Sequence, residues 1–484
     1  MKTRSAKRCR LFAFAPAITC MLLGASTWCA FADTPERAAS KPPIAGPLHV
    51  APGSLFFVDA DGRGIFLTGS HTWANFQERG VRGETPDFDY DAYLAFLDRF
   101  GHNFMRMWMW EHALRMQFVP ADVPVRYEPL PYRRTGPGTA ADGLPKFDLE
   151  QFDETFFRRL RARVETARAH RIYVAVMLFQ GFSVEQKGTD GVDPHKGNPW
   201  EGHPFNVRNN VNGIDGDLNH DGEGIEVHTL ADPRFTRLQE RFVAKVVDTL
   251  GDLDNVLWEI CNEGHRGSLA WQDHMAQFIR QIEKSRPLQH PIGITGAPLG
   301  TNELLTTSAD WIAPTGKQWL TDPPRPSGGK RIVVDTDHIA PWNHDPTWPW
   351  RCLTRGCSFI LMDGYMDFRL GSPDRPNPEW DDVRRAMGAA RRASERLDLA
   401  QAVVDTKRAG TGFCLTVPGE SVLVFQPDRG KPFTLTLEPG RYRGLWHDVW
   451  GEHETAITVT SDGTPQTLTP PRGDAAVLFL QRIR

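Results

Sequence analysis

The chain carries an apolar stretch that ends in an amide and a carboxylate, Asn262 and Glu263. Residues 255–261 before this pair read Asn-Val-Leu-Trp-Glu-Ile-Cys and have the length and apolar character of a buried strand. Alternation along a strand predicts that Glu259, Cys261 and Glu263 share one face, with Glu263 outermost. If this strand belongs to a (β/α)8 barrel, a carboxylate at its carboxyl end would reach a substrate at the mouth of the barrel. The alternative is that Glu263 only caps the following helix.

A second pair of carboxylates, Asp335 and Asp337, follows another apolar run, and the same alternation predicts that they share a face. Hydrolysis of a glycosidic bond uses two carboxyl groups, one to protonate the leaving oxygen and one to act as nucleophile or to activate water. We assign the first role to Glu263 and the second to Asp337, with Asp335 as its orienting neighbour. The reverse assignment of the two aspartates stays open, as does the alternative that they bind a cation or fix Arg106.

The ends of the other predicted strands carry side chains that suit a sugar. Sugars present hydroxyls in the ring plane and apolar C–H faces above and below it, so polar groups and indoles together bind them. The candidate substrate-binding residues are His71, Trp73, Arg106, Trp110, Glu111, Asn262 and His338. We therefore expect a carbohydrate substrate.

Eight apolar runs separated by amphipathic stretches must position these residues. Such alternation is typical of a parallel sheet covered by helices and predicts an α/β fold, a (β/α)8 TIM barrel over residues 48–399. A doubly wound open sheet is the alternative, but no Gly-rich phosphate loop follows any of the runs. The predicted strands are residues 65–69, 103–108, 172–179, 255–261, 291–295, 311–313, 331–334 and 358–362.

Residues 400–484 have a different pattern, with short β-rich runs separated by Pro, Gly and Asp turns and no helical stretch between them. This pattern predicts a small all-β sandwich domain. Such a domain either binds a ligand or covers the flank of the barrel.

The residues described so far carry a family resemblance. Residues 255–263 resemble the fourth strand of clan A glycoside hydrolases, the cellulase and mannanase superfamily, and residues 102–106, His-Asn-Phe-Met-Arg, are similar to the Asn-x-x-Arg of their second strand. Residues 54–397, with Gly-Ser-His-Thr-Trp at 69–73 and Asp-Thr-Asp-His at 335–338, are similar to secreted bacterial cellulase-like proteins. The C-terminal domain resembles a β-sandwich provisionally named collagen-binding.

This resemblance implies that Glu263 is the proton donor, that Asn262 binds the sugar 2-hydroxyl and that Arg106 orients the nucleophile. The seventh strand departs from the clan pattern, because the clan has a glutamate where this chain has Asp335 and Asp337. Aspartate is shorter by one methylene, so the distance to Glu263 could exceed the roughly 5 to 5.5 Å of a retaining pair. Retention is the clan's expectation, and inversion stays open.

The first 32 residues have the features of a secretory signal peptide: five basic residues, an apolar run and Ala30-Phe31-Ala32 as a cleavage site. Residues 33–47, rich in Pro, Ala and Lys, are a predicted linker. We therefore expect a secreted or periplasmic protein with no membrane attachment after cleavage. Removal of the signal changes the formal net charge from −4 to −9, and no basic stripe is present, which argues against a nucleic-acid partner.

One loop has the spacing of metal ligands. Asp217, Asn219, Asp221 and Gly222 are placed as at the start of an EF-hand calcium loop, although His228 stands where the bidentate acid belongs. A structural calcium ion is therefore a candidate ligand, and we expect no cofactor to be required. The four cysteines that follow the signal have neither a disulfide framework nor zinc spacing. Cys352 and Cys357 could pair in an oxidising compartment, but we expect two buried thiols.

Two other functions fit parts of the pattern. A metal-dependent hydrolase barrel could use Asp335, Asp337, His338 and His71, although such barrels usually begin with His-x-His on the first strand. A non-catalytic secreted protein that binds carbohydrate or matrix would keep the barrel, but the two filled carboxyl positions favour an enzyme. A Gly-x-Ser-x-Gly motif is absent near the strand ends, which argues against a serine hydrolase.

Overall fold

The computed structural model describes residues 41–186, 193, 195–296, 300–340, 343–363, 365 and 377–483. The predicted signal peptide and most of the predicted linker lie outside these residues. Residues 41–47 of the linker are described, and there the buried Lys41 Nζ donates to Asp98 Oδ1 at 2.5 Å and to the His102 carbonyl at 2.9 Å. Within the described part of the chain, none of the helices is both long and apolar enough to cross a membrane.

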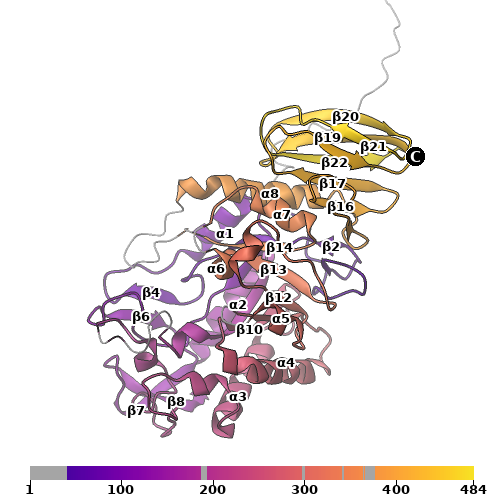
Figure 1. Ribbon diagram of the computed structural model, residues 1–484. Helices are drawn as coiled ribbons and strands as arrows, with labels where there is room; N and C mark the ends of the chain where they lie inside the picture. The colour runs from indigo at the N-terminus through magenta and orange to yellow at the C-terminus, as the bar shows by residue number, and fades with distance from the viewer. Residues whose placement is uncertain are drawn as a thin grey trace, which may run out of the picture. The chain divides into compact units, whose positions relative to one another are not determined.

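Eight parallel strands close into a barrel (Figure 1). Each strand overlaps one of the eight predicted runs, so the TIM barrel is confirmed and the open sheet is wrong. In order around the barrel the strands are β3 (Thr68–His71), β5 (Phe104–Met107), β9 (Tyr173–Gln180), β10 (Val256–Asn262), β11 (Ile292–Thr295), β12 (Trp311–Ala313), β13 (Arg331–Asp335) and β14 (Ser358–Met362).

Helices cover the outside of the barrel and begin at acidic caps. Asp89, Asp153 and Asp232 accept backbone N–H groups at the first turns of α1, α2 and α3. The apolar faces of these helices share one hydrophobic core with the outward side chains of the strands. The helices are α1 (Tyr90–Arg99), α2 (Glu154–Ala169), α3 (Pro233–Leu250), α4 (Leu269–Glu283), α5 (Thr301–Leu305), α6 (Thr336–Ile339), α7 (Trp348–Thr354) and α8 (Asp381–Ser394).

The segment before the first barrel strand and the loops after the barrel strands contain short elements that the sequence patterns did not predict. Three antiparallel pairs are β1 (Phe57–Val58) with β2 (Gly64–Ile65), β4 (Glu78–Val81) with β6 (Val125–Glu128), and β7 (Tyr132–Thr139) with β8 (Pro145–Phe152). The 3-10 turns are Gly181–Ser183, Pro199–Gly202, Ile225–His228, Arg266–Ser268, Lys317–Leu320 and Pro378–Trp380.

The barrel interior is apolar at one level and polar at the next. Phe104, Leu257 and Val333 belong to an apolar cluster formed by inward side chains of the strands. Two residues further along β5, β10 and β13 stand Arg106, Glu259 and Asp335, which face the same way because side chains alternate along a strand. The strands therefore place a layer of charged groups nearer their carboxyl ends.

The C-terminal strands form two layers, shown in yellow in Figure 1. Their core includes Val424 and Leu478 from the large sheet and Phe433 and Leu435 from the small one, which confirms the predicted sandwich. The large sheet has the order β15 (Val403–Val404), β16 (Cys414–Val417), β17 (Ser421–Gln426), β22 (Ala476–Arg482), β19 (Gly440–Asp448) and β20 (Glu454–Ser461). The small sheet pairs β18 (Phe433–Thr436) with β21 (Pro465–Leu468).

The outer face of the large sheet packs against the barrel. Phe425 and Phe479 belong to the same hydrophobic core as Trp350 of α7, and Trp350 Nε1 donates to the Val449 carbonyl at 2.8 Å. This sheet therefore covers a flank of the barrel, one of the two roles considered for it. Cys261, Cys352, Cys357 and Cys414 are free and buried, as expected.

Candidate active site

Arg106 lies at the centre of the charged layer and is fully buried. Its Nε donates to Glu259 Oε2 at 2.9 Å, its Nη1 to Asp335 Oδ2 at 2.6 Å and its Nη2 to Asn262 Oδ1 at 2.8 Å. Nη2 also contacts the other oxygen of Glu259, which accepts the Thr295 hydroxyl. Burial alone would lower the pKa of Arg106, but Glu259 and Asp335 raise it above its ordinary value. One guanidinium thus joins β5, β10 and β13, and its charge is tolerated because it is paired.

Asp335 uses both of its oxygens inside the protein. Oδ2 accepts from Arg106, while Oδ1 lies 3.2 Å from His71 Nε2 and accepts the Asp337 backbone N–H at 2.9 Å. Burial alone would raise the pKa of Asp335, but His71 and Arg106 hold it well below its ordinary value. Asp335 is therefore an ionised and fully enclosed group.

Asp337 does not share a strand face with Asp335, so that prediction was wrong. Strand β13 ends at Asp335, and Asp337 belongs to the first turn of α6. The cause is local, because the Asp335 carboxylate accepts the Asp337 N–H and caps the helix. The side chain of Asp337 is 10% exposed, whereas that of Asp335 is 0% exposed.

The predicted alternation also fails at the end of β10. Ile260 and Cys261 both pack into the outer hydrophobic core, and Asn262 instead of Cys261 joins Glu259 beside Arg106. Glu263 then leaves the strand with φ of 49°, in the left-handed region. A non-glycine residue there costs roughly 1–2 kcal/mol, which the surrounding structure must offset.

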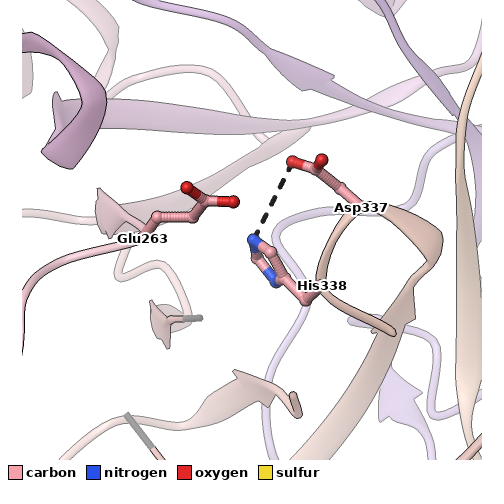
Figure 2. A group of neighbouring side chains, drawn as sticks. All are labelled: Glu263, Asp337 and His338. Atoms are coloured by element: carbon pink, nitrogen blue, oxygen red, sulfur yellow. Dashed lines mark ion pairs between the residues drawn. The ribbon is translucent and has the colours of Figure 1, made fainter. Parts of the chain in front are cut away.

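Glu263 and Asp337 nevertheless lie close together. An oxygen of Glu263, an oxygen of Asp337 and a ring nitrogen of His338 all lie within 4.8 Å of one another. Figure 2 shows the two carboxylates pointing toward a common centre, with the imidazole beside them. The shorter aspartate therefore does not widen the pair, because Asp337 extends from α6. This spacing matches a retaining pair better than an inverting one.

His338 donates its ring hydrogen to Asn262 beside this centre. Arg106 can only donate, so the Asn262 atom that it contacts is the carbonyl oxygen Oδ1. His338 Nε2 lies 3.0 Å from the same oxygen and must also donate. Nε2 is 4.0 Å from Asp337 Oδ2. Burial lowers the pKa of His338, so the ring is neutral with its hydrogen on Nε2.

Glu111, a predicted substrate-binding residue, is engaged by the protein itself. Its Oε1 accepts the Gln180 backbone N–H at 2.6 Å and lies 3.0 Å from His228 Nε2, and Oε2 lies 3.4 Å from His203 Nε2. Burial alone would raise the pKa of Glu111, but His228 and His203 lower it to about 2. Because Gln180 Oε1 accepts from Asn262 Nδ2 at 3.0 Å, Glu111 supports the end of β9 next to the site.

The predicted aromatic residues lie at the mouth but are mostly covered. His71 stacks on Trp108, with ring centroids 4.9 Å apart and planes 18° apart. Trp110 is buried, and its Nε1 donates to the Trp73 carbonyl at 2.8 Å. Trp73 is also buried.

The candidate calcium loop folds on its own side chains. Asp217 Oδ1 and Oδ2 accept the N–H groups of Asp221 and Gly222 at 3.1 and 3.0 Å. Asn219 Nδ2 donates to Asp221 Oδ2 at 2.9 Å. Within the described residues the one group with three clustered ligand atoms is Glu263, Asp337 and His338. Calcium binding by this loop stays a prediction.

Sequence reasoning gave Glu259 and Thr295 no role at the site. The signal for Glu259 was present, since it is a charged residue within an otherwise apolar strand. Thr295 ends β11 and carried no distinguishing pattern.

A protein-family model matches part of this chain. The family described as "Domain of unknown function (DUF6298)" matches residues 109–298. A comparison with curated proteins finds no match.

Solved structures give closer information about the fold. A provisionally assigned glycoside hydrolase from Bacteroides vulgatus ATCC 8482 has a TM-score of 0.59 and 13% identity, over 90% of this chain and 82% of its own. A glycoside hydrolase family 5 protein from the same organism has a TM-score of 0.56 and 12% identity, over 90% of this chain and 94% of its own. The expected resemblance is thus confirmed in the fold: this chain has the barrel architecture of glycoside hydrolases that include family 5.

Proposed function

We propose that the protein is a glycoside hydrolase that cleaves O-glycosidic bonds of a polysaccharide or oligosaccharide. The observation that carries this proposal is the close approach of Glu263 and Asp337 at the ends of the fourth and seventh barrel strands. Two carboxylates at this spacing can act as the acid/base and the nucleophile of a retaining glycosidase. The glycoside hydrolase fold of the structural neighbours supports the same conclusion.

In this mechanism Glu263 donates its proton to the glycosidic oxygen as the bond to the anomeric carbon breaks. Asp337 attacks that carbon and forms a covalent glycosyl ester. Glu263, now ionised, takes a proton from water, and the resulting nucleophile releases the sugar and restores the Asp337 carboxylate. Glu263 is protonated again at the end of this cycle.

The remaining polar residues hold the pair in place. Asp335 is a poor nucleophile because both of its oxygens are engaged, so we assign it a positioning role through its bond to the Asp337 N–H. Asn262 donates one Nδ2 hydrogen to Gln180, and the second is suited to the sugar 2-hydroxyl. Arg106 fixes Asp335 and Asn262 together.

The metal-dependent alternative is less well supported by the site. His338 would have to offer a lone pair, but the nitrogen that faces Asp337 donates its hydrogen to Asn262. His71, the other imidazole of that hypothesis, lies against Asp335 and not in the cluster of Glu263 and Asp337. A metal ion would therefore require both rings to change partners.

The N-terminal sequence features support a secreted or periplasmic location for this activity, with carbohydrate as the substrate. We propose this location because residues 1–32 have the features of a secretory signal peptide.

The proposal is tested by assaying the purified protein on a panel of plant and bacterial polysaccharides. We expect Glu263→Gln and Asp337→Asn to lose at least a thousandfold in kcat, and Glu420→Gln, an exposed control in the C-terminal domain, to keep full activity. Azide should restore turnover to Asp337→Gly as an inverted glycosyl azide. Full activity in Glu263→Gln, or glycan binding without hydrolysis by the unaltered protein, would contradict the proposal and favour the non-catalytic alternative.

A further inference from the structure

An aromatic cluster takes its residues from four neighbouring barrel strands and the loops that follow them. Trp73 and Trp108 follow β3 and β5, and the same cluster contains Met177 of β9 and Met362 of β14. These four strands are consecutive around the barrel in the order β14, β3, β5, β9. The strands on either side of them are β13 and β10, which lead to Asp337 and Glu263.

Phe118 brings this cluster to the surface. Its side chain is 43% exposed, and it is the only aromatic residue among the large hydrophobic residues found exposed in the described part of the chain. Its ring centroid lies 5.6 Å from that of Trp73, with the planes 35° apart. Single exposed apolar residues need no explanation, but a phenyl ring held against a tryptophan at a barrel mouth is a preformed apolar surface.

Direct contacts connect this ring to the charged layer. Trp73 packs against Trp108 with centroids 6.0 Å apart, Trp108 stacks on His71, and His71 Nε2 lies 3.2 Å from Asp335. Trp110 meets Trp73 edge-on at 6.0 Å and holds its backbone through an N–H bond. The exposed ring is therefore connected to Asp335 of the charged layer through Trp73, Trp108 and His71.

We propose that Phe118, backed by Trp73, is a binding subsite for a sugar ring of the substrate chain that lies away from the bond that is cleaved. The apolar C–H face of a pyranose or furanose packs on an aromatic ring, and a phenyl ring adds no hydrogen bond. The subsite therefore recognises the apolar face of the sugar ring and does not discriminate between patterns of sugar hydroxyls. This inference rests on the proposed function for its ligand, but binding tests it without hydrolysis.

The binding test uses the Glu263→Gln protein, tryptophan fluorescence, and cellohexaose, mannohexaose and xylohexaose as probes, together with the panel polysaccharides. We expect Phe118→Ala to raise the dissociation constant of the bound probe about tenfold, and Phe118→Trp to restore the original affinity. Leu230→Ala, another exposed apolar position, is the control and should leave binding unchanged.

In the active protein, Phe118→Ala should raise KM for the hexasaccharide about tenfold with kcat changed less than threefold, and leave p-nitrophenyl monoglycosides nearly unaffected. Unchanged affinity in Phe118→Ala, or no binding of any probe or polysaccharide, would overturn the subsite. Glycan binding that depends on Phe118 without any hydrolysis would uphold the subsite and overturn the proposed catalytic function.

Discussion

Gly181 lies directly against the backbone of Glu263. A Cβ atom added at position 181 would stand 2.2 Å from the Glu263 carbonyl oxygen. Only glycine fits this approach without a backbone shift. The contact thus holds the left-handed turn from which the Glu263 carboxylate faces Asp337.

Gly181→Ala should therefore displace Glu263 and damage the carboxylate pair. We expect kcat/KM to fall at least tenfold and the free energy of unfolding to fall by about 1–3 kcal/mol, the usual cost of forced overpacking. Urea denaturation and steady-state kinetics measure the two effects. Gly473→Ala is the matched control, because a Cβ there meets no atom within 4 Å. Equal behaviour of the two variants would refute this role of Gly181.

The stereochemistry of hydrolysis follows from the pair. Because an oxygen of Glu263 and an oxygen of Asp337 lie within 4.8 Å of each other, nearer to the separation of roughly 5 to 5.5 Å in a retaining pair than to the roughly 6.5 to 9.5 Å of an inverting pair, we expect the first sugar released to keep the anomeric configuration of the substrate. Proton NMR during the first minutes of hydrolysis measures this before mutarotation. Release of the opposite anomer would show that the carboxylates separate in the working enzyme.

Removal of the Arg106 guanidinium should destabilise the whole barrel. Arg106→Met leaves the buried carboxylates of Glu259 and Asp335 without their cation, and breaking a buried pair costs about 3–5 kcal/mol. Arg237→Met removes an exposed pair with Glu150 and should cost less than about 1 kcal/mol. Urea unfolding compares the two, and similar losses would contradict the central role of Arg106.

Acid should destabilise the protein before its carboxylates titrate. Burial lowers the pKa of His102 and of His112 to about 3, while the unfolded chain binds a proton near pH 6.5. The unfolded state therefore holds more protons between about pH 6.5 and 3. The free energy of unfolding falls as the pH falls through this window, by up to about 1.4 kcal/mol per pH unit for each histidine.

Urea titrations at several values between about pH 7.5 and 4.5 measure this slope. His102→Gln can still donate to the Arg384 carbonyl, which His102 Nε2 contacts at 3.2 Å, so the variant should fold and show a shallower slope. The same pH dependence in the variant and the unaltered protein would rule out His102 as a source.

Calcium binding by the Asp217 loop predicts a rise in Tm in calcium relative to EDTA. Asp217→Ala should abolish the rise, since this side chain also holds the Asp221 and Gly222 N–H groups. Differential scanning calorimetry measures both. A Tm that does not respond to calcium would leave the loop as a set of hydrogen-bonded turns.

The sequence predicted the barrel because strand and helix periodicities are local, and every predicted strand is present. It also selected Glu263 and Asp337, which the structure brings together. The path to that pair was not predictable, because alternation assumes a regular strand. Cys261 turns outward into the outer core, and Glu263 adopts a positive φ. Asp335 caps a helix at Asp337. The alternation pattern shows neither the tertiary contacts nor the local capping behind these departures. Glu259 stood out as a charged residue in an apolar strand, but its pairing with Arg106, 153 residues away, was not visible in the pattern.

The position of Arg106 also bears on how the barrel assembles. Its partners come from β5, β10 and β13, and the Asp335 contact spans 229 residues of sequence. A fragment that stops before β13 would enclose the guanidinium with one of its two counterions missing, so half-barrels should be poor folding units. Burial of this charge favours the complete ring of strands over partial ones. Arg106 therefore both positions residues of the candidate site and stabilises the closed barrel.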